Sequence, residues 1–331
     1  MTDTRPAVHP LVPAAELAPE LFDPASIAPD TARFNEELER AIAAAPSVHT
    51  LPPAVIRQAR EEGRGIWGPI QRVAEAKDRT IPGPGGAIPI RVYVPPQVRG
   101  VYLHLHGGGW MLGAAHHSDV RNWAIARHAR LAVVSVNYRL SPEHPYPAGP
   151  DDCEAAALWL VKNAQSEFGS DRLSIGGESA GAHLSLVTML RLRDRHGLTP
   201  FRAANLVYGA YDLAMTPSVR RWGERNLVLS TPIIGWFTSA FVPDPTRRAD
   251  PDVSPIHADL AGLPPSLLTV GTLDPLLDDS LFLWPRLRAA RVRAELAVYP
   301  GGVHGFNAFP IELARLANAR AEHFLAMSVE R

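Results

Sequence analysis

A serine, an aspartate and a histidine follow one another along this chain at positions whose surroundings favour catalysis. Ser179 lies in Gly177-Glu178-Ser179-Ala180-Gly181, after a strand-like run and before a helix-like run that begins near Ala182. In that context the G-x-S-x-G pattern predicts a sharp turn, which needs flanking glycines and pushes the serine hydroxyl outward. Because a serine hydroxyl is a weak nucleophile until a base takes its proton, the sequence predicts Ser179 as a nucleophile that requires a neighbouring base.

His304 and Asp274 are the predicted partners of Ser179. His304 lies in a glycine-flanked loop just after a predicted strand, from which it can reach across the sheet edge as the general base. Asp274 directly follows an apolar run and would hold the imidazole tautomer and stabilise the imidazolium. Asp278 and Asp279 are the alternative acids, and all three carboxylates could instead favour the N-terminus of the following helix.

Three consecutive glycines follow His106, at the end of another apolar run. Without side chains, their backbone N–H groups can approach a ligand closely and point inward together, as donors for the oxyanion of a tetrahedral intermediate. The N–H of the residue after the nucleophile, Ala180, would join them. A phosphate cradle is the alternative, but no G-K-S/T follows and no G-x-G-x-x-G opens a helix here. His106 itself is expected to hydrogen-bond the loop backbone.

The composition argues against several classes of protein. The 331 residues carry 33 basic and 34 acidic side chains, a formal net charge of −1, which gives no electrostatic reason to expect nucleic acid. Cys153 is the only cysteine, so no disulfide can form within the chain. No stretch approaches the length of a membrane span, and residues 1–20 do not resemble a secretory signal. A soluble cytoplasmic enzyme is expected.

Most of the 13 histidines are expected to do no chemistry. His104 alternates with leucines in a strand and should be a packed core residue. Five others fall in loops or on helix surfaces and are expected to be solvated: His116, His117, His128, His196 and His323. Arg191, Arg193 and Arg195 are likewise expected at a solvated helix terminus. No set of His, Cys and Asp has convincing ligand spacing, so neither a metal nor a cofactor is predicted.

Short apolar runs alternate with helical stretches from about residue 70 onward, which predicts an α/β fold whose mostly parallel sheet is covered on both faces. A hairpin with alternating apolar residues is expected within 72–95. Later strands are expected at 101–105, 131–136, 173–175, 205–208, 267–270 and 294–299. Helices are expected at 30–45, 53–62, 119–128, 151–167, 182–195, 277–290 and 311–326.

Two segments do not follow this alternation of apolar runs and helical stretches. Residues 1–65 contain helix-like pieces without strand alternation and are expected to form a helical arm. Residues 211–257 are too long for a crossover and carry aromatic side chains and prolines. We expect them to form a lid over an apolar pocket at the carboxyl edge of the sheet, although a packing insertion without substrate contact would also fit. The hydrolase core would then comprise 66–210 and 258–331.

The motifs together resemble those of the hormone-sensitive-lipase-like esterases, the bacterial family IV type, in the α/β-hydrolase superfamily. The resemblance covers about residue 70 to the C-terminus. It rests on His106-Gly107-Gly108-Gly109-Trp110, the segment Tyr138–Pro147, Gly177–Gly181, Asp274-Pro275-Leu276 and His304-Gly305-Phe306. Two positions depart from the family pattern: Glu178 stands where Asp is frequent, and Gly-Ala-His follows Ala180 where Gly-Gly-Asn is common.

The resemblance implies an α/β-hydrolase core with a cap built from the N-terminal arm and the insertion. It implies a triad of Ser179, Asp274 and His304, and an oxyanion hole formed by the N–H groups of Gly108, Gly109 and Ala180. It further implies carboxylic ester substrates with short to medium acyl chains, and a homodimer formed through the last strand. Five residues are expected as pocket walls, with ordinary core packing as the alternative: Trp110, Met111, Trp222, Trp236 and Phe306.

These features predict a serine carboxylesterase that acts on a small-molecule ester through an acyl-enzyme. An amidase or lactonase with the same triad is the first alternative, because acyl transfer needs the same groups. A non-catalytic ligand-binding relative is the second, and the presence of His304 argues against it, because receptor relatives of this family lack the triad histidine.

Overall fold

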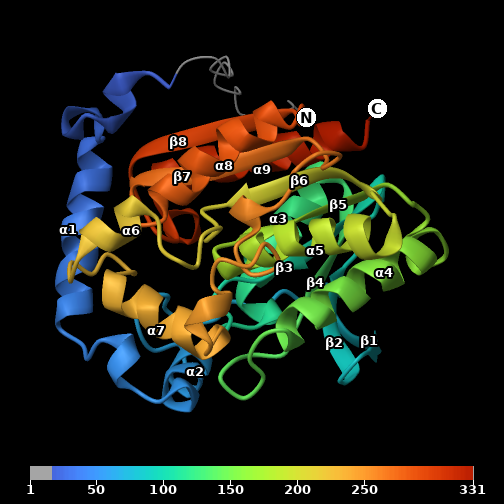
Figure 1. Cartoon of the computed structure of the whole chain (residues 1–331), viewed down its shortest axis with the longest axis horizontal. Coiled ribbons are helices and arrows are strands. Elements are labelled where there is room, and N and C mark those ends of the chain that lie inside the picture. Colours follow the sequence, from blue (N-terminus) through green and yellow to red (C-terminus); the bar gives the residue numbers. More distant parts are fainter. Residues whose placement is uncertain (1–16, 331) are drawn as a thin grey trace.

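The computed structural model describes residues 17–330 and contains an eight-stranded sheet within them (Figure 1). The strand order is β1-β2-β4-β3-β5-β6-β7-β8. β1 and β2 form the expected antiparallel hairpin, β2 pairs antiparallel with β4, and all later pairs are parallel. The strands are β1 (Lys77–Gly83), β2 (Gly86–Tyr93), β3 (Gly100–Leu105), β4 (Leu131–Val136), β5 (Leu173–Glu178), β6 (Phe201–Val207), β7 (Ser266–Leu273) and β8 (Ala294–Val303).

Helices cover both faces of this sheet, and the alternation of side chains along the strands shows why. In β3, Val101 and Leu103 pack in the same core cluster as residues of α4 and α5, whereas Tyr102 packs on the opposite face with residues of α3 and α9. Every residue of β3 and β4 is therefore buried, as expected for a parallel sheet between two helical layers. The helices are α3 (Asp119–Ala129), α4 (Ala148–Phe168), α5 (Ala180–His196), α8 (Leu277–Ala289) and α9 (Glu312–Ser328).

α5 is the central helix that follows Ser179. Its residues are buried from Ala180 to Leu192, and it ends at Gly197, which adopts a left-handed φ of 66°. Glycine takes that conformation without a steric cost, so it stops the helix. The helix begins at Ala180, two residues earlier than the sequence predicts.

The helices predicted within residues 1–65 are present as α1 (Pro29–Ala43) and α2 (Pro53–Glu61). The insertion 211–257 contributes α6 (Pro217–Trp222) and α7 (Thr231–Phe241). Figure 1 shows α6 and α7 beside α1 and α2, at one side of the sheet. Arg225 of the insertion pairs with Glu39 of α1 at 2.9 Å, which ties the two segments together.

Within residues 17–330, no helix combines the length and the apolar character that crossing a bilayer requires. Cys153 is buried in α4 as a free thiol. The expectation about a secretory signal concerns residues 1–20, of which 1–16 lie outside the described residues.

Candidate active site

The turn at Ser179 joins β5 to α5 and is strained. Ser179 has φ 56° and ψ −120°, a conformation that costs a non-glycine residue free energy and persists only where the surroundings enforce it. The carbonyl oxygen of Leu105 leaves no room beside the turn: a Cβ would come within 1.9 Å of it at Gly177 and within 1.8 Å at Gly181. Both flanking positions therefore require glycine for the neighbouring strand end to approach, as the G-x-S-x-G pattern predicts.

Ser179, His304 and Asp274 form one hydrogen-bonded chain. The Nε2 of His304 lies 2.9 Å from the Ser179 hydroxyl oxygen, and its Nδ1 lies 2.9 Å from Oδ2 of Asp274. Because the carboxylate can only accept, Nδ1 carries the ring proton and Nε2 presents its lone pair to the serine hydroxyl. Asp274 is 1% exposed and its other oxygen accepts the N–H of Leu276, so the carboxylate is held from both sides.

Neighbouring strands bring these side chains together. Asp274 directly follows β7 and His304 directly follows β8, and the two strands are parallel neighbours, so both residues leave the same sheet edge. Two contacts outside the predicted set support the histidine loop. The ring of Tyr208, which follows β6, lies 4.7 Å from the imidazole of His304, and Asn35 of α1 donates to the carbonyl of Gly301.

The two alternative acids point elsewhere. Asp279 accepts hydrogen bonds from the backbone N–H groups of Tyr211 and Asp212 at the start of the insertion, and Asp278 accepts from the N–H of Ser218. They fasten the insertion to the start of α8, and Asp274 is the carboxylate in contact with His304.

The glycine loop after β3 has its carbonyl groups engaged by neighbours. Tyr138 donates to the carbonyl of His106, Nδ1 of His106 donates to that of Gly107, and the N–H of Leu112 donates to that of Gly108. By contrast, the structure shows no acceptor among residues 17–330 for the N–H groups of Gly108, Gly109 and Ala180. Gly107 of the same loop lies against the nucleophile, since a Cβ there would be 3.5 Å from that of Ser179.

His106 is neutral and structural in this loop. Burial lowers its pKa to about 3, and the imidazole stacks on Tyr138 at 4.3 Å. Its bond to the Gly107 carbonyl confirms that it contacts loop backbone. The segment Tyr138–Pro147 borders the loop, since the N–H of Ser141 also donates to the carbonyl of Trp110.

The five expected wall residues separate into two groups. Trp110, Met111 and Phe306 are buried core residues, exposed by 5%, 1% and 0%. Trp222 and Trp236, in the insertion, are partly exposed. Phe237 of the insertion is not among the five predicted wall residues, but it packs on the glycine loop: a Cβ at Gly109 would meet its ring at 2.3 Å. Its place in the aromatic-rich insertion was the available signal.

His104 is buried, as predicted, but it also belongs to a polar network under the serine. Its Nε2 lies 3.0 Å from the carboxylate of Glu178, and its Nδ1 lies 2.7 Å from the hydroxyl of Ser135. Burial alone would raise the pKa of Glu178, but the contact with His104 lowers it below its usual value. Glu178 is therefore a paired carboxylate directly before the serine.

Among the described residues, Glu61, His116 and His117 are close enough together to be considered as metal ligands. Both Nε2 atoms face the Glu61 carboxylate, at 2.9 and 2.8 Å. However, Arg60 donates through Nε to Nδ1 of His117, and an arginine can only donate, so the ring proton of His117 lies on Nε2. No lone pair is then left there for a metal, and we propose none. The two histidines are partly buried and paired between α2 and the turn Ala115–Ser118, rather than freely solvated as predicted.

Comparison with known proteins places this site in a family. A family model described as the α/β hydrolase fold matches residues 102–308, which include the glycine loop, Ser179, Asp274 and His304. The chain belongs to the α/β-hydrolase fold family. The predicted fold class is thereby confirmed.

Two curated relatives and one solved structure show where this α/β hydrolase lies within the family. It is 38% identical over 252 residues to the carboxylesterase NlhH of Mycobacterium tuberculosis, covering 72% of this chain and 77% of that protein. It is 37% identical over 243 residues to the carboxylic ester hydrolase LipN of the same organism, covering 70% of this chain but only 64% of LipN. The hyperthermophilic esterase of Pyrobaculum calidifontis superposes with a TM-score of 0.82 at 30% identity, over 92% and 99% of the two chains. The resemblance to esterases inferred from the motifs is confirmed.

Proposed function

We propose that this α/β hydrolase is a serine carboxylesterase that hydrolyses short- to medium-chain carboxylic esters through an acyl-enzyme. The observation that carries the proposal is the chain of 2.9 Å contacts from Ser179 through His304 to Asp274, on a strained turn that presents the serine hydroxyl. Nucleophile, base and orienting acid are the three groups that acyl transfer requires. The names of the relatives, all esterases, agree with this chemistry.

In the first half of the reaction, Nε2 of His304 takes the hydroxyl proton while the oxygen of Ser179 bonds to the ester carbonyl carbon. The N–H groups of Gly108, Gly109 and Ala180 would stabilise the oxyanion that forms. The carbon–oxygen bond to the alcohol then breaks, and His304 gives its proton to the departing alkoxide.

In the second half, His304 removes a proton from water as the water oxygen adds to the acyl carbon. The intermediate collapses, Ser179 regains a proton from His304, and the carboxylic acid leaves. Asp274 would stabilise the imidazolium present in both halves.

The cap would limit the size of the acyl group. α7 places Phe237 directly on Gly109, and Trp236 lies beside Phe237 with ring centroids 5.0 Å apart. Space next to the proposed oxyanion donors is therefore bounded by aromatic side chains, which favours small acyl groups. The names of two further relatives, the ethyl acetate hydrolase of Pseudomonas putida and the acetyl esterase of Salmonella, agree with this preference. In this proposal the described part of the predicted arm 1–65, residues 17–65, forms the cap with 211–257, and 66–210 with 258–330 form the core.

The test is hydrolysis of p-nitrophenyl esters from acetate to palmitate by the wild type and Ser179→Ala in parallel. We expect turnover of the short esters that falls with chain length and is abolished in the variant. Equal turnover by Ser179→Ala would refute the proposal. Absence of ester turnover by folded wild type, with cleavage of an amide or lactone, would replace it with the alternative activity. The homodimer through β8 and a cytoplasmic location stay predictions from the sequence.

A further inference from the structure

His183 lies on α5, one turn after the nucleophile, and is fully buried. Both of its ring nitrogens have partners from other parts of the chain. The indole Nε1 of Trp110 donates to Nδ1 at 3.1 Å, and Nε2 donates to the carbonyl of Val253 at 2.8 Å. An indole N–H can only donate and a carbonyl can only accept, so the imidazole is fixed as the neutral tautomer with its proton on Nε2. His183 thus joins two segments that are far apart in the sequence.

The first segment is the glycine loop. Trp110 immediately follows Gly109 and has a backbone φ of 59°. This left-handed conformation is rare for residues other than glycine, asparagine and aspartate. Its indole is held by the bond to His183 and by stacking on Phe241 of α7, with ring centroids 4.6 Å apart and an interplanar angle of 7°. These side-chain contacts help to hold the strained backbone of Trp110, together with the hydrogen bond that its carbonyl accepts from the N–H of Ser141.

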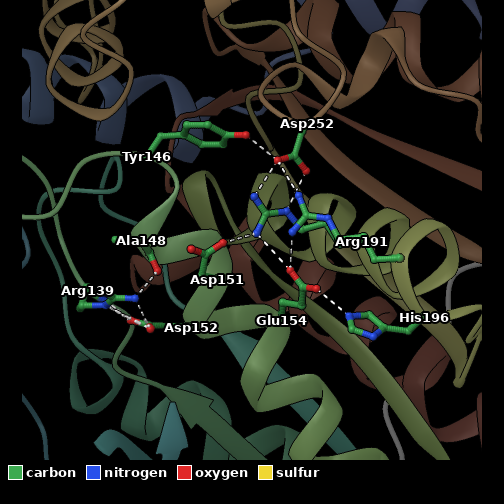
Figure 2. Close-up of polar contacts among 10 residues, drawn as sticks. Arg139, Tyr146, Ala148, Asp151, Asp152, Glu154, Arg191, His196 and Asp252 are labelled. Carbon is green, nitrogen blue, oxygen red and sulfur yellow. Dashed lines mark hydrogen bonds and ion pairs between the residues drawn. The ribbon is translucent and has the colours of Figure 1, made fainter. Parts of the chain in front are cut away.

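The second segment is the chain that returns from the insertion to the core, Asp252–Ser254. Figure 2 shows Asp252 between Tyr146 and the guanidinium of Arg191. Arg191 donates to both carboxylate oxygens of Asp252, at 2.7 and 2.6 Å, while its remaining nitrogen bonds Asp151 and Glu154 of α4 (Figure 2). Arg191 is 2% exposed, contrary to the solvated helix terminus expected for it. Two residues of α5, His183 and Arg191, thus hold two successive residues of the returning chain.

We propose that His183 is a positioning residue that holds the oxyanion loop in its reactive geometry through Trp110, and fastens that loop to the returning segment of the cap through Val253. This inference rests on the proposed esterase function. Loss of the Trp110 bond would let the backbone of Trp110 relax from its left-handed conformation and turn the N–H groups of Gly108 and Gly109 away from the oxyanion. Those donors stabilise mainly the transition state. Misplacing them is therefore expected to lower kcat and to leave KM nearly unchanged.

Two substitutions at this position separate hydrogen bonding from packing. His183→Asn retains one acceptor for the Trp110 indole and one donor for the Val253 carbonyl, whereas His183→Leu fills the site without either. We expect His183→Leu to lower kcat for p-nitrophenyl acetate at least tenfold with KM within twofold of wild type, and His183→Asn to restore kcat to within about threefold. Thr188→Val is the matched control, because Thr188 is buried on the same helix and its hydroxyl has no partner among residues 17–330; it should leave kcat unchanged.

Trp110→Phe provides a second route to the same contact, since it keeps an aromatic ring against Phe241 but removes the indole donor. It should lower kcat as His183→Leu does, and the double variant should be no worse than either single one. If His183→Leu does not fold, Trp110→Phe and His183→Asn decide the question alone. Equal loss of kcat in His183→Asn and His183→Leu, a loss confined to KM, or fully additive effects in the double variant would overturn the proposal.

The rate at which a p-nitrophenyl phosphonate labels Ser179 separates this inference from the proposed function. Labelling uses the nucleophile and the oxyanion donors but needs no hydrolysis of an acyl-enzyme. If wild-type protein is labelled rapidly but does not hydrolyse esters, the esterase function is refuted. The positioning role is then judged from the labelling rates of the variants. Equal labelling by the wild type, His183→Leu and Trp110→Phe would refute the positioning role even if the wild type is an esterase.

Discussion

The buried neutral state of His183 makes the protein less stable in acid, by an amount that a single substitution can isolate. Burial lowers the pKa of His183 to about 4, from an ordinary value of 6.5. The folded protein therefore binds this proton only below about pH 4, whereas the unfolded chain binds it below about pH 6.5. Between these values the unfolded state holds more protons, so the free energy of unfolding rises with pH. The contribution is complete above pH 6.5 and is lost as pH falls towards 4.

The shift of about 2.5 pKa units corresponds to about 3 kcal/mol in total, of which about 2 kcal/mol is lost between pH 7 and pH 4.5. His183→Asn cannot take up a proton in this range and keeps the two hydrogen-bonding roles. We therefore expect the unfolding free energy of the wild type to fall about 2 kcal/mol further than that of the variant over this interval.

The assay is urea unfolding at pH 7 and pH 4.5, followed by far-ultraviolet circular dichroism, for the wild type and His183→Asn. The other acid-sensitive groups, including the buried His106, are common to both proteins and cancel in the comparison. Parallel pH dependence of the two proteins would refute the neutral, doubly bonded histidine on which this reasoning depends.

Three further substitutions test separate parts of the structure. Gly109→Ala places a Cβ 2.3 Å from the ring of Phe237 at a φ of 59°, so kcat should fall at least tenfold, and Phe237→Ala in that background should recover part of the loss; no effect of Gly109→Ala on kcat would contradict the close packing. Asp274→Asn should lower kcat by about 10⁴ by favouring the wrong tautomer of the triad histidine, with unchanged circular dichroism, and a loss under tenfold would count against its role. Arg191→Leu removes the buried cation that Asp151, Glu154 and Asp252 share, although the last two keep a contact with Arg195. It should lower the free energy of unfolding by about 3 kcal/mol in urea titrations; unchanged stability would show that the network contributes nothing.

Most of the sheet and the helices around it could be predicted from local patterns. The sequences of β3 and β4 are nearly continuous apolar runs because helices cover both faces of these strands. The sequence of α5 is apolar on nearly all sides because the helix is buried along most of its length. The sequence predicts the start of α5 two residues late because Ala180 and Gly181 resemble part of a turn. Gly181 is helical nevertheless, and it is glycine because the Leu105 carbonyl lies against it.

Contacts between distant parts of the chain were not predictable in the same way. Arg191 has the sequence position of a solvated arginine near a helix end, and only the fold brings Asp252 within 2.7 Å of it. His116 and His117 could not be assigned to Glu61, which lies 55 residues earlier and meets them through the packing of α2. The site residues were easier to identify, because Ser179, Asp274 and His304 each lie at or directly beyond a strand end, where the topology decides which side chains meet.

Covalent capture of the nucleophile tests the central claim most directly. The protein is treated with a p-nitrophenyl phosphonate, the released p-nitrophenol is counted against protein, and the modified peptide is identified by mass spectrometry. We expect one equivalent of p-nitrophenol, a single phosphonyl group on Ser179, and no labelling of His304→Ala on the same timescale. Labelling of a different residue, or none in folded wild-type protein, would contradict the assignment of Ser179 as a nucleophile activated by His304.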